Sequence, residues 1–433
     1  MHILLIHQAF AAVGEPGGTR HHEFARGLAG MGHWVTIVAG QVSYLTGEHT
    51  GRGGWPQEQT DVPGVRILRC YTYRGWHRSF LHRVLSFFSF MASSFVVSLR
   101  VRSVDVVWGT SPPLFQGFTA WLLARLKGAG FLFEVRDLWP EFAIAAGVLR
   151  NPILIRLSTW LEGFLYSRAD RLVVNSPGFI EPVRQRGGRE IELVANGVDV
   201  RMFDPSSRGE DFRTEHGLQT KYVALYAGAH GLSNDLTVVL EAARRLTDRP
   251  DIALVFLGDG KEKPRLMRQA ESLELRNVQF LPSMPKEQMA QALAAADACI
   301  AILLPLEAYK TTYPNKVFDY MAAGRPVALA IDGVIRQVVE GAGAGIFVPP
   351  GDGAALAAAL RRLADDPAGG RRMGAAGRRC VEASFDRQRL SLEMARALLA
   401  AAQARGRDGG APGTPSASPR AYEEQPHHQG PTS

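Results

Sequence analysis

The sequence predicts an α/β protein of two Rossmann-like domains, each built on a doubly wound parallel sheet, with a ligand cleft between them. The chain has 433 residues, which is more than one hydrophobic core usually supports. Short apolar runs alternate with longer helical patterns through nearly its whole length, as they do in parallel α/β layers. Such sheets bind ligands at the carboxyl ends of their strands, so the candidate sites are sought there.

Six apolar runs in each half predict the strands. In the first half they are residues 3–7, 34–40, 65–70, 104–109, 131–137 and 171–176. In the second half they are residues 222–228, 252–258, 278–281, 298–303, 326–331 and 345–350. The turn-rich stretch 187–205 separates the two sets. We therefore predict one domain over residues 1–190 and a second over residues 191–384.

The C-terminal part of the chain divides into two segments. Residues 385–403 have a helical pattern and are predicted to be the final ordered helix. Gly, Pro and Ser dominate residues 404–433, and this composition predicts a disordered tail.

Bulk properties narrow the class of protein. Hydrophobic residues make up 46% and charged residues 21% of the chain, as in globular proteins. The net charge of +7 is compatible with anionic ligands or an anionic membrane surface. Cys70, Cys299 and Cys380 match no metal-ligand spacing and favour a reducing compartment. Without a signal-peptide pattern or a twenty-residue apolar run, we expect a cytoplasmic protein that needs no metal, cofactor or nucleic acid.

The segment TTYPNKVFDYMAAGRPV, residues 311–327, is the first candidate site. Pro314 favours an extended residue before it, and Asn315 is a good N-cap, so a helix is expected from about Lys316. The first-turn amides would form an anion site beside Lys316. Asp319, one turn later, could accept hydrogen bonds from a ribose diol. The alternative is a surface salt bridge between Lys316 and Asp319 at (i, i+3) spacing.

This segment resembles the signature of retaining glycosyltransferases of family 4, which have the GT-B fold. The form YPNKVFDYMAAGRP is similar to the subgroup that transfers N-acetylated amino sugars, such as the L-fucosamine transferases of surface polysaccharide assembly. The resemblance extends to about residue 403 and implies that the first domain binds the acceptor and the second the nucleotide sugar. It implies that Lys316 contacts the donor phosphate and Asp319 the ribose. Where the family commonly has an acidic residue that contacts the sugar, this chain has Thr311, and Glu307 is the open alternative.

Two more loops of the second half point to phosphate binding. Gly228 and Gly231 lie between a predicted strand and a predicted helix and allow close backbone approach. His230 stands near the place where similar family members have basic residues, and it either donates to phosphate or is structural. After the next strand, Lys261 and Lys263 either reach the cleft or are solvated charges at a helix start. Lys261 is the preferred candidate.

The first half contributes two segments. Gly17 and Gly18 precede a predicted helix and resemble the family's glycine pair, whose amides approach the donor from the opposite domain. Arg136 and Asp137 end a predicted strand where many family members have a histidine that contacts the transferred sugar. Either side chain could orient sugar hydroxyls, Asp137 could act as base or nucleophile, or the two could pair and hold the loop.

Residues 84–99 indicate whether the protein contacts a membrane. Serines recur there at helical spacing opposite a broad apolar surface that contains Phe88, Phe95, Val96 and Leu99. Basic residues flank the segment: Arg78, Arg83, Arg100 and Arg102. This pattern suits an interfacial helix on anionic lipid at the inner face of the cytoplasmic membrane. The alternative is a helix buried against the sheet, and both can hold together.

These features predict a retaining hexosyltransferase-type enzyme. It would move a sugar, expected to be an N-acetylated amino sugar, from a nucleoside diphosphate, with UDP as the family-level expectation, to a polyprenyl-diphosphate-linked or glycan acceptor. Cationic side chains and helix N-termini would stabilise the leaving diphosphate. The alternatives are a nucleotide-sugar 2-epimerase, which the signature disfavours, and a non-catalytic nucleotide-sugar-binding partner subunit, suggested by Thr311 and Arg136.

Overall fold

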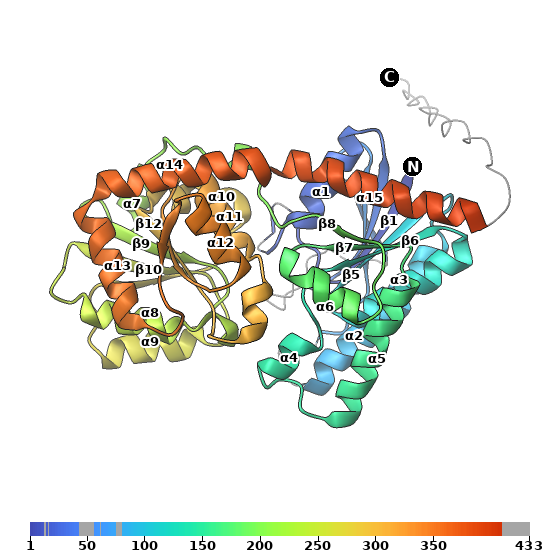
Figure 1. Cartoon of the computed structure of the whole chain (residues 1–433), viewed down its shortest axis with the longest axis horizontal. Coiled ribbons are helices and arrows are strands. Elements are labelled where there is room, and N and C mark those ends of the chain that lie inside the picture. Colours follow the sequence, from blue (N-terminus) through green and yellow to red (C-terminus); the bar gives the residue numbers. More distant parts are fainter. Residues whose placement is uncertain (13, 16, 43–55, 61, 75–79, 409–433) are drawn as a thin grey trace, which may run out of the picture.

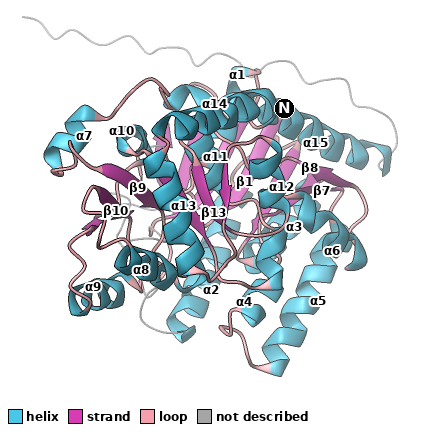
Figure 2. Cartoon of the chain, turned by 60° about the vertical axis from the view of Figure 1, so that its left-hand side comes forward, coloured by secondary structure: helices cyan, strands magenta, loops and turns pink. Residues whose placement is uncertain are grey.

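The computed structural model describes the chain except for residues 13, 16, 43–55, 61, 75–79 and 409–433. It contains two α/β domains side by side, and the long helix α15 (Arg387–Asp408) lies along the first of them (Figure 1). In each domain, helices enclose a central sheet (Figure 2). The predicted fold class is confirmed.

In the described residues, eight strands form the N-terminal sheet in the order β3-β4-β2-β1-β5-β6-β7-β8. Neighbours are parallel except β3 and β4. The strands are β1 (His2–His7), β2 (Trp34–Gly40), β3 (Gln57–Thr60), β4 (Val65–Cys70), β5 (Val106–Ser111), β6 (Gly130–Val135), β7 (Arg171–Val174) and β8 (Ile191–Leu193).

Two of these strands were not predicted, and one of them moves the domain boundary. Strand β3 has the polar sequence QEQT, and β8 has three residues that are not fully buried. Neither contains the apolar run that marks a buried strand. Since β8 pairs with β7, the predicted boundary at residues 190 and 191 is wrong, and the first sheet continues to Leu193.

The C-terminal sheet has six described strands in the order β11-β10-β9-β12-β13-β14, all parallel. They are β9 (Tyr222–Ala227), β10 (Ile252–Leu257), β11 (Val278–Leu281), β12 (Ala298–Ile302), β13 (Val327–Ala330) and β14 (Gly345–Phe347). The strand order reverses between β9 and β12, and such a switch point opens a crevice at the carboxyl ends of the strands.

Helices cover both faces of each sheet. In the N-terminal domain they are α1 (Arg20–Gly30), α2 (Phe80–Leu99), α3 (Leu114–Lys127), α4 (Glu141–Ala145), α5 (Pro152–Arg168) and α6 (Ile180–Gln185). In the C-terminal domain they are α7 (Glu210–Glu215), α8 (Leu236–Arg245), α9 (Lys263–Ser272), α10 (Lys286–Ala295), α11 (Asn315–Ala322), α12 (Val334–Gly341), α13 (Gly353–Asp365) and α14 (Pro367–Ser384). None of the described helices combines the length and apolarity needed to cross a membrane.

The final helix returns to the N-terminal domain. Its residues Leu390, Met394 and Leu398 are buried in one cluster with Phe24 of α1 and the inner faces of β1, β2 and β5. Helix α15 continues to Asp408, so the prediction of disorder is wrong for residues 404–408. Residues 409–433 lie outside the described residues, and disorder there stays a prediction. By this return, Arg387 is carried to the junction of the two domains.

Candidate functional site

A cavity of about 890 Å³ lies between the two domains. From the N-terminal side its lining includes residues 17–20, which enter α1, and Arg387 at the start of α15. From the C-terminal domain it includes residues 227–229, 257–261, 283, 284 and 286, together with Asn315, Lys316 and Asp319 of α11. These loops follow the carboxyl ends of strands, where open α/β sheets bind ligands.

Lys316 is a half-buried amine whose hydrogen-bond partners are uncharged. Its Nζ donates to the Tyr226 hydroxyl at 2.9 Å and to Asn234 Oδ1 at 3.1 Å, and it lies 4.2 Å from the centre of the Tyr226 ring. Burial lowers the pKa of Lys316 to about 7. An anion brought into the cavity would supply the opposite charge that the amine lacks.

The start of α11 differs by one residue from the expectation. Asn315 is the first helical residue and Pro314 takes the N-cap position, so the prediction that Asn315 caps the helix is wrong. Pro314 accounts for this, because its extended backbone already sets the helix entry. Asn315 Oδ1 is buried and has no hydrogen-bond partner in the described part of the chain, although Asn315 lines the cavity. A buried acceptor of this kind is satisfied when a ligand donates to it.

Asp319 is paired with a lysine that sequence reasoning missed. Lys286 Nζ lies 3.0 Å from one carboxylate oxygen of Asp319 and 3.3 Å from the other. Burial raises the pKa of Asp319, and Lys286 opposes that shift. The alternative of a salt bridge between Lys316 and Asp319 is therefore wrong, because each has a different partner. Lys286 follows β11 in the sequence SMPK, and no local motif marks it.

Of the predicted phosphate loop, Gly228 lines the cavity and His230 and Gly231 are not part of its lining. Gly228 has φ of +148°, and a Cβ there would lie 3.1 Å from Lys316 Nζ, so this position needs glycine. His230 is buried near the rings of Phe256 and Phe280. Burial lowers its pKa to about 4. These surroundings favour the structural alternative for His230.

The two lysines of the next loop have different surroundings. Lys261 is exposed and lines the cavity. Lys263 donates from Nζ to the carbonyl oxygens of Gly258 at 2.8 Å and Leu281 at 2.9 Å. Lys263 thus holds the loop to the sheet, and Lys261 lines the cavity; its role in donor binding stays a prediction.

The predicted glycine pair lines the opposite wall. Gly17 has φ of +147°, and a Cβ on Gly18 would meet no atom within 4 Å. Behind the pair, Arg20 donates to the carbonyl oxygens of Val194 and Ala195, each at 2.7 Å. Space around Gly18 therefore remains open toward the cavity.

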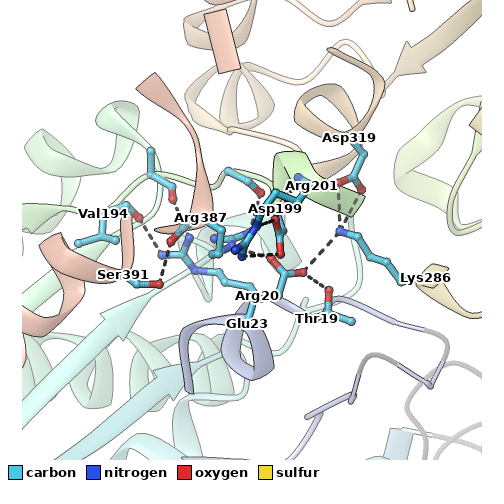
Figure 3. A network of polar contacts seen from close by, with 12 residues as sticks. Thr19, Arg20, Glu23, Val194, Asp199, Arg201, Lys286, Asp319, Arg387 and Ser391 are labelled. Carbon is cyan, nitrogen blue, oxygen red and sulfur yellow. Dashed lines mark hydrogen bonds and ion pairs between the residues drawn. The ribbon is translucent and has the colours of Figure 1, made fainter. Parts of the chain in front are cut away.

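Arg387 is a further basic residue of the cavity that had no sequence signal. It donates from Nε to Glu23 at 2.8 Å and from Nη2 to the Gly197 carbonyl at 2.5 Å (Figure 3). Its Nη1 is buried and lacks a partner among the described residues. Only the return of α15 brings this side chain to the site.

Arg136 and Asp137 do not belong to the cavity lining. Arg136 Nη1 lies 3.3 Å from His7 Nε2, and burial raises the pKa of the half-buried Asp137 to about 6. The described residues contain no salt bridge between the two, so the proposed Arg136–Asp137 pair is wrong. Both follow β6, at the same sheet edge as His7 of β1.

Glu307, the open substitute for the missing acidic residue, is not part of the cavity lining. Its side chain is 87% exposed and pairs with Lys310 at 2.7 Å. In the described part of the chain, no group of three His, Cys, Asp or Glu side chains could hold a metal ion.

Comparison with protein families assigns both domains. Residues 17–197 match the model described as a glycosyl transferase 4-like domain. Residues 221–366 match the model described as glycosyl transferases group 1. The two matched segments together make up well over half of the chain.

Curated relatives agree with these matches. The putative colanic acid biosynthesis glycosyl transferase WcaI of Escherichia coli is 25% identical over 356 residues, which are 78% of this chain and 86% of that protein. The probable glycosyltransferase WbjE of Pseudomonas aeruginosa is 27% identical over 285 residues, 64% of this chain and 70% of that protein.

Solved structures share the fold. A sucrose-phosphate synthase from Thermosynechococcus elongatus aligns with a TM-score of 0.72 at 19% identity and covers 91% of this chain and 97% of its own. Anabaena HepE in complex with UDP-glucose aligns with a TM-score of 0.69 at 16% identity, over 92% and 99% of the two chains. At these identities the likeness shows the GT-B fold.

Proposed function

The chain is a glycosyltransferase of the GT-B type, and from this premise we propose that it transfers a sugar from a nucleoside diphosphate donor with retention of configuration. One observation carries the proposal. The interdomain cavity contains a half-buried lysine, Lys316, that has no carboxylate partner among the described residues and lies one helical turn from a carboxylate, Asp319. A nucleoside diphosphate complements both groups: its phosphates carry the negative charge that Lys316 would bind, and its ribose hydroxyls can donate hydrogen bonds to Asp319.

Lys316 and its neighbours would bind the diphosphate. The positive φ of Gly228 lets the backbone come close to a phosphate without a side chain in the way. Asn315 and Lys261 line the same wall, and Gly17 and Gly18 face it from the other domain. Asp319 would accept hydrogen bonds from the ribose.

The chemical step would depend on electrostatic stabilisation. As the bond between the anomeric carbon and the diphosphate breaks, negative charge grows on the leaving oxygen. A cation already held at that place costs no reorganisation, and such groups often supply the largest part of catalysis. Lys316 is that cation, and its low pKa would rise when the diphosphate binds beside it. Attack by the acceptor on the same face, with its proton passing to the leaving phosphate, gives retention.

Several relatives support a UDP-linked donor or a role in surface glycans, and one of them supports an amino sugar. Solved neighbours of the same fold include HepE with UDP and TarM of S. aureus with α-GlcNAc-glycerol and UDP. WaaG is described as a glycosyltransferase involved in lipopolysaccharide biosynthesis, and WcaI is named for colanic acid biosynthesis. We propose an N-acetylated amino sugar on UDP as donor and a glycan or polyprenyl-diphosphate-linked sugar as acceptor.

The acceptor would meet the carboxyl edge of the N-terminal sheet. Side chains at the carboxyl ends of β1, β5, β6 and β7 there have buried polar atoms without partners in the described part of the chain, namely those of His7, Ser111, Arg136 and Asn175. Sugar hydroxyls can satisfy both donors and acceptors of this kind. In this proposal Arg136 orients the acceptor, and Asp137, with its raised pKa, is a candidate base.

The apolar end of the N-terminal domain supports contact with a membrane at the cytoplasmic face. Helix α2 is partly buried through Phe90 and Val97 and exposes Phe88, so both alternatives for this segment find support. Helix α5 exposes Ile153 and Trp160, at 67% and 63%, in a stretch without acidic residues from 142 to 161. Such a face suits anionic lipid. Of the predicted flanking arginines, Arg78 and the Arg83 side chain lie outside the described residues.

A donor screen tests the function directly. A nucleotide sugar that binds the native protein raises its melting temperature, so purified protein is scanned against nucleoside diphosphates and their sugars. Each stabilising donor is then incubated with lipid-linked and free glycan acceptors, and product and anomeric configuration are read by NMR. An epimer formed from donor alone would indicate the 2-epimerase, and binding without transfer or hydrolysis would indicate the non-catalytic subunit.

A further inference from the structure

One carboxylate, that of Glu23, is in contact with both walls of the cavity (Figure 3). Glu23 lies in the first turn of α1 and accepts a hydrogen bond from Thr19, which follows the Gly17–Gly18 pair. On its other side it lies 3.8 Å from Lys286 Nζ. Lys286 in turn contacts both oxygens of Asp319. A continuous polar path therefore runs from the N-terminal glycine loop to the proposed ribose-binding carboxylate.

Charges alternate along this path, and all are shielded from solvent. Asp319, Lys286, Glu23 and Arg387 have side chains that are 16%, 12%, 6% and 5% exposed. Arg387 and Lys286 hold the pKa of Glu23 at about 2 in spite of its burial. The two carboxylates and two cations balance, so removal of one leaves a buried charge without its partner.

The stability of α10 does not explain Lys286. Lys286 is the first residue of this helix, where the helix dipole disfavours a positive charge. Its two carboxylate neighbours come from α11 and from α1 of the other domain. The side chain is thus placed by the site and not by its own helix.

We propose that Lys286 and Glu23 are positioning residues for the donor: Lys286 orients the Asp319 carboxylate toward the ribose, and Glu23 ties that lysine to the Gly17–Gly18 wall. The inference rests on the proposed function. Lys286 occupies one side of the carboxylate and leaves its remaining lone pairs for the two ribose hydroxyls. It also cancels the charge of Asp319, which would otherwise repel the diphosphate.

Steady-state kinetics on substituted proteins test the proposal. The set is Lys286→Met, Lys286→Arg, Asp319→Asn and the double variant Lys286→Met with Asp319→Asn. We expect Lys286→Met to raise the donor KM by about tenfold, with kcat within about twofold, because the lysine does not touch the reacting atoms. Lys286→Arg keeps the charge and should restore most of the affinity. Lys221→Met is the control, since Lys221 Nζ donates to the exposed Pro250 carbonyl and Lys221 is not part of the cavity lining.

The double variant separates positioning from direct contact. If Lys286 acts through Asp319, Lys286→Met adds nothing to the KM of Asp319→Asn. An additive rise, or a wild-type KM in Lys286→Met, overturns the proposal. Should Lys286→Met not fold, Lys286→Arg provides the same test. It should raise the donor KM by a smaller factor, and this rise should disappear when Asp319→Asn is also present.

Glu23→Gln tests the tie between the walls. This variant keeps an oxygen acceptor for Thr19 but removes the charge that faces both Lys286 and Arg387. The donor KM should rise several-fold, and the rise should be clearly smaller in the Lys286→Met background, where the part that acts through Lys286 is already lost. Independent effects contradict the tie. A wild-type protein that binds no nucleotide sugar would refute the proposed function itself, whereas normal wild-type kinetics with an unaffected Lys286→Met would refute this inference alone.

Discussion

Two lysines line the same cavity, and their surroundings are opposite. Lys316 has a phenol and an amide as partners, and burial lowers its pKa to about 7. Lys286 is just as enclosed, yet Asp319 and Glu23 raise its pKa in spite of that burial. Burial lowers the pKa of an amine, and nearby carboxylates can more than offset this effect. The lysine without a carboxylate is free to bind an anionic ligand, and the paired lysine holds the protein together around it.

The sharpest test of this comparison is Lys316→Ala. We expect kcat to fall about 10²- to 10³-fold, as when one preorganised donor to a developing negative charge is removed. The protein should stay folded, because the amine contributes no ion pair to the fold, and the melting temperature should fall only slightly through loss of its hydrogen bonds to Tyr226 and Asn234. The rate of transfer is measured from the amount of nucleoside diphosphate released, and Lys221→Ala is the control. Turnover within twofold of wild type would remove Lys316 from the mechanism.

Asp319→Asn tests the carboxylate that pairs with Lys286 and is proposed to bind the ribose. A hydrogen bond to a charged group contributes about 1.5–3 kcal/mol, so donor affinity should fall about 10- to 100-fold. Isothermal titration with the nucleotide sugar measures the loss. The deoxyribose form of the same donor is the matched ligand: it should bind wild type more weakly and lose little more in the variant. Equal losses for both ligands would show that Asp319 does not bind the ribose diol.

The pH dependence of donor binding should distinguish the two lysines. The free protein has Lys316 charged below pH 7 and neutral above it, because burial lowers its pKa. Since the diphosphate favours the charged amine, affinity is full below pH 7 and should fall by about tenfold for each pH unit above it, until the pKa of the complex is reached. Titrations from pH 6 to 9 measure this. In Lys316→Arg the guanidinium stays charged, and a pH dependence that persists there would assign the effect to another group.

The smallest effect concerns the two glycine positions. A Cβ on Gly18 meets no protein atom within 4 Å, whereas one on Gly228 meets Lys316 Nζ at 3.1 Å. Gly18→Ala should therefore leave the melting temperature unchanged and raise the donor KM only a few-fold, through contact with the ligand. Gly228→Ala should also lower the melting temperature, because its φ of +148° strains any other residue. The same melting temperature for both variants would contradict this difference.

Patterns of local sequence were sufficient for the architecture. Buried strands such as residues 252–257 are uninterrupted apolar runs, and period and length identify them without tertiary information. The strands that escaped prediction, β3 and β8, are short and only partly buried. Their pairing depends on a neighbouring strand and not on their own composition.

At the candidate site, sequence motifs predicted the positions of glycines and strand ends better than they predicted which residues a side chain contacts. Gly17, Gly18, Gly228 and Lys316 line one cavity, as their positions after strands suggested. By contrast, His230 packs against aromatic rings, and Asn315 is a helical residue and not its cap. A side chain's direction depends on residues from other elements, and no local pattern records it.

The sequence by itself determined two parallel α/β layers and the glycine-bearing strand ends, because periodicity and backbone freedom are local properties. Only the tertiary structure decided which charges meet. Glu23, Lys286, Asp319 and Arg387 come from four helices of two domains, and they form one buried network because α15 folds back across the N-terminal sheet. Buried charges need partners, and those partners are chosen in space and not along the chain.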